Sequence, residues 1–157
     1  MTATETAMAA LVAALNASSA LPDVRRDAVF DEVLEEFADA GETYGRALVL
    51  RIGDSIDVVR RLGDGPEAYE HVRNADVEWF IARRVATPAD GAALAQKFDA
   101  GIEAVFVAIE ANPTLSNAVT RAEVAEAPEI GSDSAGSKSV LTALIHVQLT
   151  YTSARAY

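Results

Sequence analysis

The sequence predicts an α+β fold in which an antiparallel or mixed β-sheet carries two main helices packed on one face. Three stretches support this prediction. Residues 88–111 have the apolar spacing of a long helix, and residues 69–85 and 139–153 alternate apolar and polar positions as half-buried strands do. No repeat of strand–helix–strand units is evident, so an antiparallel sheet covered by helices is the natural layered solution. The chain of 157 residues is expected to form one domain over residues 1–157.

The long helix is predicted to begin at Thr87-Pro88, because threonine is a good N-cap and proline is tolerated in the first helical turn. Asn112-Pro113 ends it. At 1.5 Å per residue such a helix is roughly 35 Å long, which is enough to cross a small sheet. Its apolar stripe consists of Leu94, Phe98, Ile102, Val105, Phe106 and Ile109.

Two further segments have helical spacing. Residues 4–16 are predicted to form a helix, and Thr2 and Glu5 ahead of its apolar positions have the spacing of a capping box. Because this region carries Glu5 and no basic stretch, it is interpreted as a helix and not as a signal peptide. Residues 27–40 fit a helix that Asp27 could cap, and an extended arm is the alternative.

Residues 47–61 have the pattern of a β-hairpin. The strands 47–52 and 56–61 would be joined by the turn Gly53-Asp54-Ser55, because glycine and aspartate favour tight turns. The loop 63–66, which contains two glycines and a proline, then breaks the pattern.

The long strand 69–85 has an apolar face formed by Ala75, Val77, Trp79 and Ile81. We assign Trp79, Phe98 and Phe106 to the core. After the long helix, residues 119–130 are predicted to be extended, with glutamates at polar positions. Residues 131–137 are predicted to form a small-residue loop before the closing strand 139–153.

The composition limits the kinds of partner. With 24 acidic and 13 basic residues the net charge is −11, so a uniform phosphate-binding surface is not expected. The acidic balance favours solubility, and it also suits a surface that DNA can pass without sticking. The absence of cysteine removes disulfides and thiolate chemistry. No stretch reaches the roughly 20 apolar residues that cross a membrane.

One glycine-rich segment resembles a phosphate-binding loop. Residues 131–139 read GSDSAGSKS, which is one residue too long before Lys138 for the G-x-x-x-x-G-K-[ST] pattern. A phosphate loop also opens a helix, whereas this segment opens an alternating stretch. We interpret it as a hairpin loop and expect no nucleotide site there.

The sequence names no catalytic group. His71 and His146 are the two histidines, and each falls on the polar side of a predicted strand without identifiable partners. We interpret both as surface or interface residues. The chain is therefore expected not to be an enzyme, with no catalytic residue, cofactor or metal.

Clustered charges suggest interaction surfaces instead. The acidic side chains Asp31, Glu32, Glu35, Glu36 and Asp39 lie close together in the sequence without a predicted apolar pocket. They are expected to form a solvated face or an acidic interface that would suit a basic partner. The arginine pairs 25–26, 60–61 and 83–84 are solvated strand ends in a monomer, and in a ring they could meet the acidic segment of a neighbour.

Residues 87–152 resemble phage tail terminator and tail completion proteins, as found in siphophages or phage-like particles such as gene transfer agents. Three segments carry the resemblance: residues 99–105 (DAGIEAV) running into 112–115 (NPTL), residues 123–127 (EVAEA), and the closing strand 143–152 (ALIHVQLTYT). The predicted hairpin and the N-terminal helix match the family's order. Residues 27–40 depart from it, since the family usually has an extended loop there.

The resemblance implies a non-enzymatic virion protein that is assembled in the host cytoplasm and located in the tail or neck. It would form a homohexameric ring on the head-proximal end of a non-contractile tail tube. The ring would stop tube polymerisation and join a head-side connector or head-closure protein. Genomic DNA would pass through its channel without specific binding, and a channel lined by carboxylates would repel the phosphate backbone.

Interface residues matter most in this interpretation, because a closed ring uses two different patches on each subunit. The candidates are Glu32, Glu35, Glu36, Asp39, Gly53, Asp54, Ser55, Gly63, Asp64 and Gly65. Two alternatives stay open. One is another head–tail joining protein, such as a head-closure or neck subunit. The other is a small ligand-binding or enzymatic α+β domain.

Overall fold

A computed structural model describes residues 2–39, 44–63, 65 and 69–154 of the chain. It contains the helices α1 (Ala3–Asn16), α2 (Phe30–Asp39) and α3 (Pro88–Glu110). Its strands are β1 (Val24–Arg26), β2 (Tyr44–Arg61), β3 (Tyr69–Arg83), β4 (Arg121–Val124), β5 (Glu129–Ala135) and β6 (Lys138–Ser153). The predicted α+β class with a mixed sheet is confirmed.

One sheet of six strands organises the molecule, in the order β1-β2-β3-β6-β4, with β5 also paired to β6. The long strands β2, β3 and β6 form its centre and pair antiparallel. The short strand β1 pairs parallel to β2 and makes the sheet mixed. β4 and β5 pair with successive parts of β6, opposite Val147–Thr150 and Lys138–Leu144 respectively.

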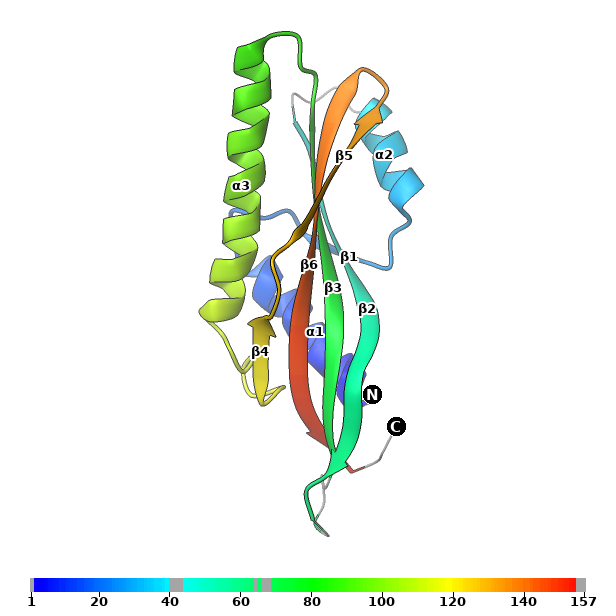
Figure 1. Ribbon diagram of the computed structural model, residues 1–157, viewed down its shortest axis with the longest axis vertical. Helices are drawn as coiled ribbons and strands as arrows, with labels where there is room; N and C mark the ends of the chain where they lie inside the picture. Colours follow the sequence, from blue (N-terminus) through cyan, green and yellow to red (C-terminus); the bar gives the residue numbers. More distant parts are fainter. Residues whose placement is uncertain (1, 40–43, 64, 66–68, 155–157) are drawn as a thin grey trace.

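The two faces of the sheet carry different helices (Figure 1). On one face α1 and α3 cover a large core that includes Trp79, Phe98 and Ile145. The opposite face has a smaller core, in which Val33 and Phe37 of α2 pack on Val49, Phe80 and neighbouring side chains. The two helices predicted on one face are therefore confirmed, and α2 is a third helix on the other face.

The predicted core and most element boundaries agree with the structure. Trp79 is 1% exposed and Phe98 is 5% exposed, so both belong to the core, while Phe106 is partly buried and packs against it. Thr87 and Asp90 form a reciprocal capping box at the start of α3. At α1 the Glu5 amide donates to Thr2 Oγ1 at 3.1 Å, while the Glu5 carboxylate pairs with Arg26.

The predicted hairpin over residues 47–61 is wrong. β2 runs through Gly53-Asp54-Ser55 as one strand, and the pairing register with β3 shifts between Ile52 and Ser55 and twice more before Arg60. Extra residues are thus absorbed as bulges, which is a common place for glycine within a strand. A Cβ at Gly53 would lie 2.7 Å from Asp76 Oδ1 and 3.0 Å from the backbone oxygen of Asn74, so the close approach of β3 favours glycine. The chain reverses instead between Arg61 and Tyr69.

Three predictions for other segments are corrected. Of the segment 27–40, the helical alternative is confirmed for Phe30–Asp39, which form α2, and Ala40 lies outside the described residues. The expected cap is wrong, because Asp27 has a φ of 55° and its amide donates to Leu50 O. Residues 119–130 are not one extended segment, since β4 ends at Val124 and β5 begins at Glu129, directly after Pro128, which lacks an amide hydrogen. The predicted loop 131–137 is mostly strand β5, and the turn is only Gly136-Ser137.

Candidate interaction surfaces

The acidic segment forms one side of α2. Val33 and Phe37 are buried against the sheet, and Asp31, Glu32, Glu35 and Asp39 are exposed. Glu36 is also exposed, and its carboxylate pairs with Arg25 of the same chain at 2.6 Å. Within the described ranges the other four carboxylates have no ion pair, so this side of α2 is a concentrated negative surface. The predicted acidic face at Glu32, Glu35 and Asp39 therefore exists as one surface.

A hollow of about 230 Å³ lies on the other face of the sheet, between α3, the start of β2 and Ala20, which precedes β1. Buried Trp79 and Gly101 form its apolar floor, and exposed Arg46 and Lys97 stand at its rim. Arg46 Nη1 approaches the carbonyl of Ala20 at 3.5 Å, and no ion pair of Arg46 or Lys97 occurs in the part of the chain that the structure describes. Local cationic charge is unusual in a chain with a net charge of −11.

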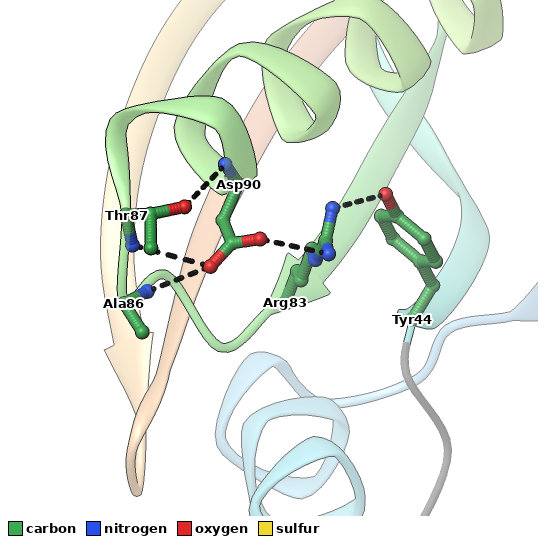
Figure 2. Close-up of polar contacts among 5 residues, drawn as sticks. All are labelled: Tyr44, Arg83, Ala86, Thr87 and Asp90. Atoms are coloured by element: carbon green, nitrogen blue, oxygen red, sulfur yellow. Dashed lines mark hydrogen bonds and ion pairs between the residues drawn. The ribbon is translucent and has the colours of Figure 1, made fainter.

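Tyr44 contacts two cations beside this hollow. The Lys97 ammonium lies 4.9 Å from the centre of the Tyr44 ring, and Arg83 Cζ lies 5.1 Å from it, both within cation–π range. Arg83 lies between Tyr44 and Asp90 (Figure 2), donating to the tyrosine hydroxyl at 2.8 Å and pairing with Asp90 at 3.0 Å. Arg83 is therefore neutralised, whereas Arg46 and Lys97 are available to an incoming anion.

Asp90 links the N-terminal cap of α3 to Arg83. Its carboxylate accepts hydrogen bonds from the amides of Ala86 at 3.1 Å and Thr87 at 3.2 Å (Figure 2). The Ala86 amide, followed by the charge of Arg83, holds the pKa of Asp90 below its ordinary value. Asp90 is thus a permanent anion at neutral pH, and it fixes Arg83.

A polar cluster crosses three strands on the face that carries α2. His146 of β6 contacts Asp76 of β3 through Nδ1 at 2.7 Å and Glu129 of β5 through Nε2 at 3.2 Å. The hydrogen bond to Asp76, and then that to Glu129, raises the pKa of His146 above its ordinary value. His146 therefore bridges two carboxylates and connects β3, β5 and β6. Its predicted position on the polar side of the strand is confirmed.

Arg51 and Glu78 form a second ion pair on this face, and Arg51 also donates to the carbonyl of Ala28. Burial raises the pKa of Glu78, and the attraction of Arg51 offsets only part of that effect. The pair ties β2 and β3 to the chain just before α2. The pair therefore holds the segment that leads into α2 and does not line an open site.

The remaining sequence candidates are not brought together with α2. Gly53 and Asp54 lie inside β2, where Ser55 pairs in register with Arg73. Gly63 and Gly65 fall in the connection between β2 and β3, at the end of the sheet far from α2 (Figure 1), and Asp64 lies outside the described residues. His71 stacks on Tyr151 of the large core, with ring centres 5.2 Å apart, and contacts Ser153. It therefore lies on the face of β3 that carries Ala75 and Val77, and its predicted position on the polar side of the strand is wrong.

Among the described residues no group of three or more His, Asp or Glu side chains is placed to hold a metal ion. In the same part of the chain, no helix combines the length and apolar character that crossing a membrane requires. No protein-family model matches the chain, and no curated protein matches its sequence.

Sequence reasoning missed the cationic hollow. Its rim comes from Arg46, before the apolar part of β2, and Lys97, in the middle of α3, and each is an isolated cation in the sequence. The only local signal is Gly101 within an otherwise strong helix, which marks a close contact but not its charge.

Proposed function

We propose that this protein is a structural assembly subunit of the tail terminator type, which forms a ring on the head-proximal end of a tail tube. The observation that carries the proposal is the resemblance over residues 87–152. In support, α3 and β6 occupy the positions where the resemblance expects a long helix and a closing strand, and β4 covers the first two residues of the expected acidic segment 123–127. In this role the chain ends tube growth and joins the tail to the head-side connector.

The surface chemistry supports a role in assembly. The acidic side of α2 and the cationic hollow lie on opposite faces of the sheet, and a ring subunit needs two such different patches. In the proposed ring DNA passes through a channel whose carboxylates repel phosphates, in keeping with the net charge of −11. A ring structure with a neutral or basic bore would contradict this part of the proposal.

The test is to measure the mass of the purified protein in solution, alone and with tail-tube protein from the same particle. A hexamer, or a monomer that assembles on tube ends seen by electron microscopy, is the expected result. Particles that lack the protein should carry tubes of unregulated length. Binding to the portal side without binding to the tube would favour a head-closure subunit. A monomer that ignores the tube and binds a small metabolite would overturn the proposal.

A further inference from the structure

We propose that the hollow over Trp79 receives the acidic side of α2 from a second copy of the chain, so that copies associate head to tail. This inference rests on the proposed ring and names the contact between its subunits. The acceptor is defined by Arg46 and Lys97 at the rim and by the apolar floor of Trp79 and Gly101.

The acidic side of α2 is exposed and can contact a neighbouring subunit. Asp31, Glu35 and Asp39 are spaced by four residues and so lie along one side of the helix, with Glu32 beside them. The opposite side is held to the sheet by buried Val33 and Phe37. The four carboxylates are thus presented outward on a packed helix, without a cation of their own chain in the described ranges.

The hollow has the matching charge. Lys97 lies beside the Tyr44 ring at 4.9 Å, and among the described residues the one hydrogen-bond partner of Arg46 is a backbone carbonyl, at 3.5 Å, so both charges can pair with a carboxylate. Arg83, the third cation of the group, is already paired with Asp90. The apolar floor strengthens the attraction, because charges interact more strongly where water is partly displaced.

The positions of the two surfaces determine the kind of assembly. The hollow is lined by residues of the face covered by α1 and α3. The helix α2 lies on the opposite face of the sheet (Figure 1). Neither surface can pair with itself, because each carries one sign of charge, and a twofold dimer would need both surfaces of each copy in one interface, which their positions on opposite faces of the sheet disfavour. The contact is therefore heterologous, and such contacts close into a ring when the rotation between neighbours allows it.

The test uses two charge-reversed proteins. In the hollow variant Arg46→Glu and Lys97→Glu are combined, and in the helix variant Glu32→Lys and Glu35→Lys are combined. Wild-type protein should associate at low salt, and association should weaken at least about tenfold as salt rises and screens the charges. Each variant alone should associate at least about tenfold more weakly than wild type, as measured by sedimentation velocity.

An equal mixture of the two variants is the decisive measurement. The cationic hollow of the helix variant accepts the unchanged α2 of the hollow variant, and the two lysines introduced on α2 can pair with the two glutamates introduced in the hollow. The mixture should therefore associate as wild type does, which also shows that both variants are folded. As a matched control for the helix variant, Glu103→Lys with Glu110→Lys makes the same change in net charge on the exposed side of α3 and should leave association unchanged.

The proposal fails if either variant alone associates as wild type does, if the mixture stays monomeric, or if wild-type protein is monomeric at low salt at its highest soluble concentration. Electron microscopy with tube protein separates this failure from failure of the proposed function. Rings of the hollow variant on tube ends would overturn the contact alone. Salt-sensitive association with restoration by mixing, but without binding to tubes, would overturn the tail role alone.

Discussion

The indole of Trp79 packs directly against the backbone of Gly101, so β3 and α3 touch where the helix has no side chain. The indole nitrogen donates to the carbonyl of Phe98 at 3.1 Å, and a Cβ at Gly101 would lie 2.2 Å from Trp79 Cε2. Trp79 is 1% exposed and cannot swing into solvent without opening the core. This contact sets the spacing between α3 and the sheet, and it also forms the floor of the cationic hollow.

Gly101→Ala is expected to destabilise the protein although alanine favours helices. Crowding a packed core costs about 1–3 kcal/mol, and the 2.2 Å contact places this substitution in the upper part of that range. The better helix propensity of alanine, about 1 kcal/mol, offsets only part of the loss. The measurement is urea unfolding followed by circular dichroism.

Gly91→Ala in the same helix is the matched control for Gly101→Ala. Its added Cβ would meet only Val85 Cγ1 at 3.7 Å, an ordinary contact, so a gain of up to about 1 kcal/mol is expected. Equal effects of the two substitutions would show that the contact between Trp79 and Gly101 does not limit the spacing of α3.

Asp90→Asn is expected to reduce the dependence of stability on pH in acid. The folded pKa of Asp90 lies below its ordinary value of 3.8, so its contribution is fully present above the unfolded pKa. That contribution is lost as the pH falls through the folded pKa. Urea unfolding between about pH 5 and pH 2.5 should show a shallower loss of stability in the variant than in wild type. Parallel curves would contradict the role of Asp90.

His146→Gln should have its largest effect at mildly acidic pH. Because the folded pKa of His146 is raised above 6.5, its stabilising contribution is complete below the unfolded pKa and is lost as the pH rises through the folded pKa. Wild-type protein should therefore lose stability over that rise, and the variant should lose less. Urea unfolding at about pH 6 and pH 9 measures the difference.

The two carboxylates that hold His146 can be ranked by NMR. The hydrogen bond to Asp76 is the largest cause of the raised pKa and that to Glu129 is smaller. Asp76→Asn should therefore lower the titration midpoint of His146 more than Glu129→Gln does. His146→Gln assigns the signal against that of His71, and the reverse order of effects would show that Glu129 is the main partner.

Gly136→Ala should weaken the hairpin between β5 and β6. Gly136 has a φ of 60° in a two-residue turn, a left-handed conformation that costs residues other than glycine about 1–2 kcal/mol. Gly136→Asn should cost less, since asparagine tolerates this conformation better. Thermal unfolding should rank glycine above asparagine above alanine, and an alanine variant as stable as wild type would contradict the turn geometry.

Local patterns in the sequence were sufficient for α1, α3, β3 and β6. In each of them the apolar spacing, the caps or the strict alternation records contact with a single large core, so the residues themselves report which side is buried. The acidic side of α2 could also be identified, because its carboxylates are adjacent in the sequence.

Only the tertiary structure decided how the remaining residues are used. Gly53 is a bulge and not a turn because a long partner strand, β3, continues past it and supplies the pairing that a hairpin would have supplied locally. The parallel strand β1 has only three residues, too few for a pattern. The cationic hollow depends on packing between β2, β3 and α3, which brings Arg46 and Lys97 together from positions 51 residues apart. Local propensity carries no record of such long-range contacts, so the acidic side of α2 was visible in the sequence and its proposed acceptor was not.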